Sequence, residues 1–222
     1  MTAGGDTFDL AEVDRLLSTT RAVRRRLDLE RPVPADVILQ CLELAHQAPI
    51  GGNEEVRRWL VITEQSLKTQ LAEIYRAQAM DYLTSLVEAG EPQTRRLGRS
   101  AMYLAENLER VPALVLSCLD RPVDLSNNEN AASYYGSVIP AIWSFQLALR
   151  ARGLGSAWTT LHLGREADAA TLLGIPGGVT QVALLPVAYT VGTEFKRAGR
   201  IPITERTYWN AWGVTTVPDA HQ

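Results

Sequence analysis

The most apolar stretch of the chain, residues 182–189, sets the architecture that the other segments must fit. Its sequence, Val-Ala-Leu-Leu-Pro-Val-Ala-Tyr, contains no charged residue and predicts a buried strand. We place this strand at the centre of a sheet as far as Pro186, which has no amide hydrogen for a sheet ladder. Three further strands are expected, at residues 59–62, at 111–119 and beginning within 155–160.

Segments with helical periodicity lie before, between and after these strands. Apolar residues recur in them at every third or fourth position, and Ser, Asp or Pro residues begin several of them. Pro140 fits its helix only in the first turn. The helices expected are residues 9–18, 34–49, one that begins at Ser66, two within 77–110 that are broken at Gly90-Glu91-Pro92, 137–152 and 166–173. These segments predict a protein that contains both helices and strands.

Length and composition indicate an ordinary globular protein. With 222 residues, the chain can form one large domain or two small ones and can bury a sizeable core. Its formal net charge is −3 and it has no second basic stripe, so we expect no nucleic-acid partner. No apolar run approaches the roughly 18 residues of a membrane span. Residues 1–6 lack the basic start and apolar core of a secretory signal, so we expect a cytoplasmic protein with no membrane association.

The cysteines and histidines give no disulfide or metal pattern. Cys41 and Cys118 lie in apolar runs without a Cys-x-x-Cys motif, so we expect buried free thiols in a reducing compartment. No two of His46, His162 and His221 have the spacing of metal ligands. We expect each histidine to be hydrogen bonded or solvated.

Four arginines within six residues, Arg21, Arg24, Arg25 and Arg26, form a local basic site in a mildly acidic chain. A guanidinium presents several donors in a planar fork that fits phosphate or carboxylate oxygens. Arg21 and Arg24 can point the same way and clamp one phosphate. The alternative is a solvated basic turn.

The sequence Ile50-Gly51-Gly52-Asn53 follows the second expected helix, which should end at Pro49. Adjacent glycines allow positive φ or a close approach of backbone amides to a flat ligand, and Asn53 offers both a donor and an acceptor. The same sequence is also consistent with an ordinary tight turn.

In their order along the chain, these segments resemble the FMN-dependent nitroreductase family. Residues 20–24 are similar to that family's Arg-Arg-Ser-Val-Arg phosphate segment, and residues 48–53 to its Ala-Pro-Ser-Gly-Gly-Asn loop. The helix before Gly153-Leu154-Gly155, the strand at 184–189 and the sequence Arg200-Ile201-Pro202 complete the resemblance, which covers most of the chain.

The resemblance implies the α+β class, with a three-layer fold in which a central mixed, mainly antiparallel sheet is flanked by helices, within an intertwined homodimer. Residues 1–222 would form a single domain, with residues 77–110 as a helical, lid-like insertion. Residues 201–222 would form a C-terminal arm whose Tyr208, Trp209 and Trp212 wrap the other subunit.

The resemblance also implies the cofactor, FMN, and the residues that would hold it. Arg21, Arg24 and Arg200 would bind the FMN phosphate, and Asn53 would hydrogen bond to the pyrimidine edge of the flavin. The full set of expected cofactor-binding residues is Arg21, Ala22, Arg24, Ile50, Gly51, Asn53, Thr159, Thr160 and Arg200. We expect no metal ligand and assign no catalytic residue, because the flavin carries the redox chemistry.

The activity that the resemblance implies is electron transfer from a reduced nicotinamide, NADH or NADPH, to a nitroaromatic, a quinone or a similar small acceptor. Two alternatives remain open, a specialised flavin dehydrogenase or oxidase of a biosynthetic pathway and a non-catalytic protein that binds or stores FMN. Both are suggested by departures from the family pattern, in which Ile50 replaces a serine and Arg57 stands in the place of a frequent tryptophan.

Overall fold

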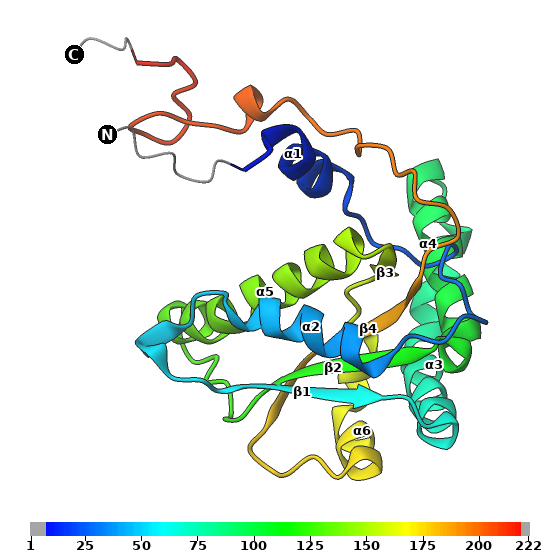
Figure 1. Ribbon diagram of the computed structural model, residues 1–222. Coiled ribbons are helices and arrows are strands. Elements are labelled where there is room, and N and C mark those ends of the chain that lie inside the picture. Colours follow the sequence, from blue (N-terminus) through cyan, green and yellow to red (C-terminus); the bar gives the residue numbers. More distant parts are fainter. Residues whose placement is uncertain (1–7, 219–222) are drawn as a thin grey trace, which may run out of the picture. The chain divides into compact units, whose positions relative to one another are not determined.

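The computed structural model describes residues 8–218 (Figure 1). They belong to two compact units, one formed by Thr20–Glu194 and the other by the chain before Thr20 and after Glu194. None of the helices between residues 8 and 218 is both long and apolar enough to cross a membrane.

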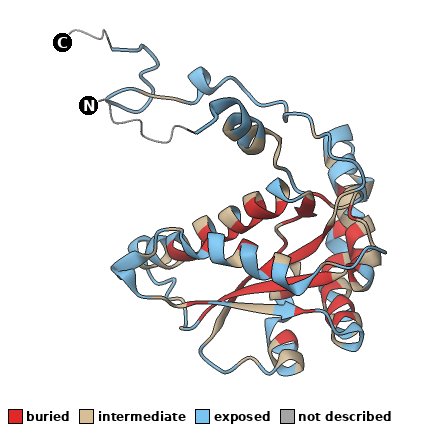
Figure 2. Ribbon diagram, viewed as in Figure 1, coloured by how far each residue is buried: buried red, intermediate tan, exposed pale blue. Residues whose placement is uncertain are grey.

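A four-stranded antiparallel sheet forms the centre of the larger unit. Its strand order is β1-β2-β4-β3, in which β1 is Arg57–Ile62, β2 is Ala113–Leu119, β4 is Thr180–Tyr189 and β3 is Leu154–Ser156. Every position of β2 is buried, as is every position of β4 except its two ends (Figure 2). The predicted central place of β4 and the α+β class are therefore confirmed.

Pro186 lies within β4, and the strand continues beyond it. The expectation that the strand is central in the sheet only as far as Pro186 is therefore wrong. Leu184 exchanges both backbone hydrogen bonds with Thr159, so the nitrogen of Pro186, two residues on, faces the same side of the strand. On that side the pairing with β3 stops at Ser156, which lies opposite Val187. Pro186, which has no amide hydrogen, therefore lies where the hydrogen-bond ladder between β3 and β4 is already interrupted.

Helices cover both faces of this sheet and make three layers. They are α2 (Ala35–His46), α3 (Gln65–Glu88), α4 (Pro92–Asn107), α5 (Asn128–Ala151) and α6 (Glu166–Leu173). α2 and α5 supply the apolar cluster on one face, with Ile38 and Phe145 fully buried in it. Leu114, Leu116 and Leu184 are also fully buried but lie outside that cluster, because their side chains belong to the other face.

Two helices are longer than predicted. α3 is continuous, so the helix expected to begin at Ser66 and the first helix expected within 77–110 are one element. α5 extends back to its cap, Asn127, whose side-chain oxygen accepts a hydrogen bond from a first-turn amide. Pro140 therefore lies inside α5, and the prediction that it requires the first turn is wrong. Pro140 has no amide hydrogen to donate to the Gly136 carbonyl, four residues earlier in the helix. Gly136 is exposed, so its carbonyl can accept a hydrogen bond from water instead.

β1 is an edge strand and is only partly buried. Ile62 is buried and Trp59 packs its ring against Phe145 at 5.7 Å between centroids, but Val61 is exposed. The expectation of a buried strand at residues 59–62 is wrong for Val61, which is exposed because an edge strand has only one neighbour.

α3 and α4 meet at a close crossing. The predicted break between them is confirmed, and the Glu91 carboxylate caps α4 by accepting hydrogen bonds from two first-turn amides. Gly98 is buried on α4, and a Cβ at that position would lie 2.8 Å from the backbone of Leu86 and of Val87 on α3. The absence of a side chain at Gly98 therefore sets the distance between the two helices.

Gly98→Val is expected to lower the free energy of unfolding by about 2 kcal/mol, because overpacking a close helix crossing forces backbone shifts. Urea denaturation of the purified protein measures this change. Gly90→Ala is the matched control, since a Cβ at Gly90 has nothing within 4 Å. Equal stability of the Gly98 variant and the wild-type protein would contradict the close packing of α3 on α4.

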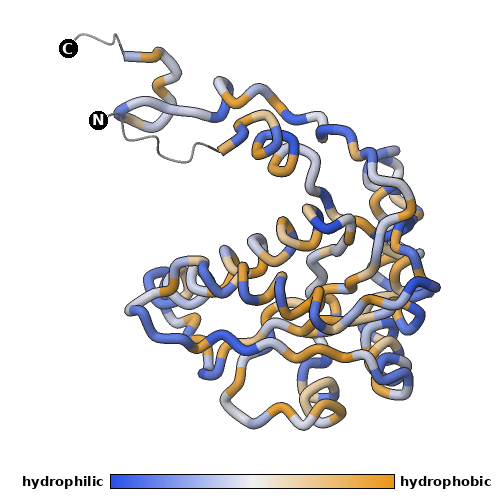
Figure 3. Tube along the Cα trace, viewed as in Figure 1, coloured by the Kyte–Doolittle hydropathy of each residue, from blue (hydrophilic) through white to orange (hydrophobic). Residues whose placement is uncertain are grey.

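The smaller unit contains α1 (Leu10–Thr19), the short 3-10 helix Ile203–Glu205 and an arm that follows it. The Asp9 carboxylate caps α1 by accepting hydrogen bonds from two first-turn amides, as the sequence predicted. No residue of α1 is buried within this unit. The arm exposes apolar side chains along its length, and Figure 3 shows apolar and polar residues mixed there. The last four residues of the expected arm, which include His221, lie outside the described residues.

Candidate functional site

The arginine segment, residues 21–26, is anchored to the sheet and is not part of a helix. The Val23 amide donates a hydrogen bond of 2.8 Å to the Ser156 carbonyl of β3, and Leu27 bridges to the chain just beyond β4. Val23 and Leu27 are both buried. A turn between Arg24 and Leu27 lies inside the segment, so the arginines leave the backbone in different directions.

Each arginine of this segment has its own surroundings. Arg21 is exposed. Arg26 is tied to the backbone, since its guanidinium donates hydrogen bonds of 2.8 Å to two carbonyls within residues 191–194. Arg25 lies over the ring of Tyr103 on α4, with 5.4 Å from its guanidinium carbon to the ring centroid. Arg26 therefore has a structural role, and Arg25 is directed towards α4.

Arg24 is half-buried, as is Arg26. Burial lowers the pKa of Arg24, and the nearby Tyr75 hydroxyl opposes this shift. Burial also raises the pKa of Tyr75, against the opposing effects of Thr159 and Arg24. The structure thus brings two predicted site residues, Arg24 and Thr159, to one buried tyrosine of α3. Within residues 8–218 no carboxylate pairs with the Arg24 guanidinium, and a half-desolvated cation of this kind is stabilised by an anion.

The loop that contains Ile50, Gly51 and Asn53 lies between α2 and β1. Gly52 and Asn53 adopt positive φ angles of 64° and 54°, which explains a glycine and an asparagine at these positions. The Gly51 amide donates a 3.0 Å hydrogen bond to the Ser137 hydroxyl of α5. The loop is a tight turn held from α5, and the side chain of Asn53 is exposed.

Arg57 holds the same loop from the other side. Its side chain is 1% exposed and forms a two-pronged pair with the Glu55 carboxylate, at 3.0 Å and 2.6 Å. Its remaining donors reach the carbonyls of Ala48 (3.1 Å) and His46 (3.2 Å) at the end of α2. The Arg57 guanidinium also holds the pKa of Glu55 below its usual range. Arg57 is therefore a positioning residue for the loop. The sequence showed only that an arginine replaces the family's frequent tryptophan, and it did not indicate this role.

The other predicted site residues are spread over both units. Thr159 is buried, and its backbone amide and carbonyl are both bonded to Leu184 of β4. Thr160 is exposed and precedes a short 3-10 helix, and Ala22 is exposed beside β3. Arg200 is an exposed residue of the smaller unit. The roles of these residues in cofactor binding stay predictions.

Cysteines, histidines and acidic residues form no metal site within residues 8–218, where no cluster of three or more such residues occurs. Cys41 and Cys118 are buried free thiols, and burial raises the pKa of Cys118 to about 12. His162 does not match its expectation. It is fully buried, and neither ring nitrogen has a hydrogen-bond partner among the described residues.

The model of the nitroreductase family matches residues 17–189, which is most of the larger unit and the end of α1. The chain belongs to the nitroreductase family. The resemblance found in the sequence is therefore confirmed. The loop at Gly51–Asn53 has the geometry of a turn, and a ligand-binding role for it and for the arginine segment stays a prediction.

Curated relatives of this nitroreductase-family chain include iodotyrosine deiodinases. The rat protein, iodotyrosine deiodinase 1, is 28% identical over 182 residues, which cover 80% of this chain and 62% of that protein. This chain therefore spans less than two thirds of the length of that relative. The iodotyrosine deiodinase of Thermotoga neapolitana is 25% identical over 181 residues, which cover 78% of this chain and 86% of that protein.

Solved structures show the same fold. A nitroreductase-like family protein from Bacillus cereus superposes with a TM-score of 0.65 at 21% identity, covering 93% of this chain and 98% of that one. The FMN and NADPH-dependent nitroreductase NfnB from a Sphigopyxis strain gives 0.66 at 16% identity, covering 90% and 99%. An iodotyrosine deiodinase bound to FMN and 3-iodo-L-tyrosine gives 0.65 at 21% identity, covering 84% and 95%. The nitroreductase-like fold predicted from the sequence is thus confirmed.

Proposed function

We propose that this nitroreductase-family chain binds FMN and uses it as an oxidoreductase. The observation that carries the proposal is Arg24, a half-buried guanidinium without a carboxylate partner within residues 8–218. It lies on the segment that resembles the family's phosphate segment. A phosphomonoester supplies the two negative charges that such a site needs. Two solved structures with this fold are an FMN-bound deiodinase and an FMN-dependent nitroreductase, which supports the choice of anion.

The residues present fit a bound flavin mononucleotide. Arg21, Ala22 and Arg24 would hold the phosphate. Arg200 is proposed as a further phosphate ligand from the sequence resemblance alone. Ile50, Gly51, Asn53, Thr159 and Thr160 are the residues proposed for the flavin ring. The amides of Gly51 and Thr159 already donate hydrogen bonds within the chain, so polar contacts to the ring fall mainly to Asn53 and Thr160.

Bound FMN would supply the two-electron chemistry, which no side chain of the protein can supply. The chain's own residues would bind the cofactor, orient its flavin ring and exclude water from one face of that ring. The proposed electron donor is a reduced nicotinamide, and the proposed acceptor is a nitroaromatic, a quinone or a similar small molecule. Buried free thiols at Cys41 and Cys118 support a reducing compartment, and we propose the cytoplasm.

We further propose that the chain acts as a homodimer. Apolar side chains are exposed on helices of the larger unit, including Leu39 and Leu44 on α2 and Ile139 and Trp143 on α5. In the smaller unit Trp212 is 91% exposed. Side chains of this size usually pack against another surface, and a second copy with an intertwined arm would cover them.

A second candidate function is reductive removal of a halogen from a halogenated phenol. It is favoured by the curated relatives, which are named as iodotyrosine deiodinases. The acceptor would then be the carbon–halogen bond, which takes up two electrons and a proton and releases halide.

The experiment that tests the proposed function is anaerobic reduction of the FMN-loaded protein. Bleaching of the flavin band by NADH or NADPH, followed by reoxidation with a nitroaromatic or a quinone, is the expected result. Release of iodide from 3-iodotyrosine by the reduced protein, with no turnover of nitro compounds, would select the second candidate. Bound flavin with no turnover of any of these donors and acceptors would overturn both and favour a storage protein.

Arg24→Met is expected to weaken FMN binding by about 10- to 100-fold, because a charge-assisted bond to phosphate is lost. Riboflavin, which lacks the phosphate, should bind the variant and the wild-type protein equally. Quenching of flavin fluorescence measures both affinities. An equal loss for FMN and riboflavin would show that Arg24 supports the fold of the site and not the phosphate.

A further inference from the structure

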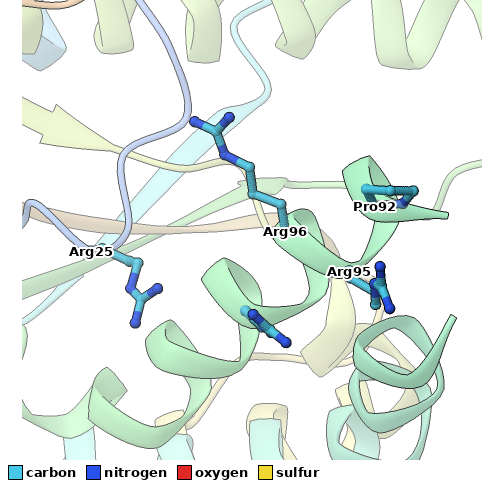
Figure 4. Close-up of a pocket in the computed structure, with 5 residues that line it drawn as sticks. Arg25, Pro92, Arg95 and Arg96 are labelled. Atoms are coloured by element: carbon cyan, nitrogen blue, oxygen red, sulfur yellow. The ribbon is translucent and has the colours of Figure 1, made fainter. Parts of the chain in front are cut away.

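A second basic site lies beside the arginine segment, on the side of α4. A cavity of about 440 Å³ is lined there by Arg25, Pro92, Arg95, Arg96 and Arg99. Figure 4 shows Arg25 on the segment before α2 and Arg95 and Arg96 on the first turns of α4, with the Arg96 side chain extending away from that of Arg95. Four of the five lining residues are arginines and none is acidic. We call this cavity the arginine pocket.

The positive charges of the arginine pocket are not neutralised by neighbouring carboxylates. The ion pairs formed within residues 8–218 involve other arginines. The nearest acidic group on α4 is its cap, Glu91, whose carboxylate accepts hydrogen bonds from two backbone amides. Those bonds, with a smaller effect of Arg95, hold the pKa of Glu91 below its usual range. Arg95 and Arg99 are one helical turn apart and repel each other, so an anion between them is favoured.

The arginine pocket is also held in place by packing. Gly98, between Arg96 and Arg99 in the sequence, brings α4 into close contact with α3. On the opposite wall, Arg25 lies over the ring of Tyr103, and its backbone is fixed by the buried side chains of the same segment. The backbones that carry these arginines are therefore fixed, while the side chains of Arg95, Arg96 and Arg99 are exposed to solvent.

We propose that the arginine pocket binds the phosphate groups of a small polyanionic molecule, in addition to the FMN phosphate proposed for Arg24. The planar guanidinium fork matches phosphate oxygens, and four such groups without acidic neighbours favour a ligand with more than one negative charge. The two sites are distinct, because Arg24 lies at Tyr75 of α3 and Arg25 at Tyr103 of α4. The phosphates come either from the nicotinamide electron donor or from a separate phosphorylated molecule. The donor source rests on the proposed function, and the site itself does not.

Isothermal titration of the FMN-loaded protein with pyrophosphate at low ionic strength tests the site. Pyrophosphate is expected to bind the wild-type protein, and the double variant Arg95→Gln/Arg99→Gln should bind it at least tenfold more weakly. Arg165→Gln is the control. Arg165 is an exposed arginine just before α6 that does not line the pocket, so this variant should bind pyrophosphate as the wild type does. No binding to the wild type, or equal binding to the double variant, would overturn the proposal.

Two further readouts keep this test separate from the proposed function. The double variant should keep the wild-type affinity for FMN and the wild-type melting temperature. A parallel loss of FMN affinity would assign the pocket to the flavin site and overturn the proposal of a second site. The pyrophosphate measurement needs no turnover, so it stands even if no electron donor is found.

Steady-state kinetics then identifies the source of the phosphates. If the donor is the source, pyrophosphate should compete with NADPH, and the double variant should raise KM for NADPH at least tenfold with kcat unchanged. If pyrophosphate binds without such competition, a separate phosphorylated molecule is the ligand. Either result supports the arginine pocket as a phosphate site.

Discussion

Arg57→Leu is expected to lower the free energy of unfolding by about 2–4 kcal/mol, since the change leaves the Glu55 carboxylate and two carbonyls of the chain without their partner. The Arg57 side chain is almost fully buried and bonds to Glu55, Ala48 and His46 at once. Arg57→Lys should recover only part of the loss, because an ammonium group cannot reproduce the planar fork. Denaturant titration measures both variants.

Arg58→Leu is the matched control for this prediction. Arg58 is the next residue along β1, but its side chain is 53% exposed and pairs with Asp120 at the surface. An exposed pair of this kind contributes at most about 1 kcal/mol. If the Arg57 and Arg58 variants lose the same stability, Arg57 is not the residue that fixes the end of α2 and the following loop.

The second large effect is a loss of stability in mild acid that depends on His162. Burial lowers the pKa of His162 to about 4 in the folded protein, against an ordinary value of 6.5. Between these two values the unfolded chain binds a proton that the folded chain does not, so stability falls as pH decreases. Above pH 6.5 the titration of His162 does not change the free energy of unfolding. Between pH 6.5 and pH 4 it lowers this free energy progressively, by about 3 kcal/mol in all.

Denaturant titration at a series of pH values measures this effect. His162→Leu removes the titrating group, so the free energy of unfolding should vary less between pH 7.5 and pH 4.5 than in the wild-type protein. His162→Asn is the second variant, because it keeps a polar side chain that does not titrate in this range. A wild-type pH dependence retained in both variants would assign the acid sensitivity to other groups.

The sequence predicted the centre of the fold because its signals there are local. β2, β4 and α6 were expected close to their observed bounds, since each is an apolar or periodic run between clear breaks. The continuity of α3 and α5 was missed. Pro140 argued for a late start of α5, and only the exposed environment of Gly136 makes an interior proline tolerable there.

The candidate site was predictable where a motif carries it and hidden where distant residues meet. The arginine segment and the loop at 50–53 were identified from their residues and their resemblance to a family. Tyr75 was not, because helical spacing places it on an apolar face and does not reveal that Arg24 and Thr159 lie beside it. The arginine pocket was also missed, since Arg25 and Arg95 are 70 positions apart in the printed sequence and only the tertiary structure joins them.

The proposal that this chain is a flavoprotein whose arginines hold the FMN phosphate is tested most directly by comparing two ligands. The purified wild-type protein is mixed with FMN and, separately, with riboflavin, and each affinity is measured by flavin fluorescence and absorbance. We predict stoichiometric uptake of FMN and binding of riboflavin that is at least tenfold weaker. A colourless protein that takes up neither ligand, or that binds both equally, would contradict the account.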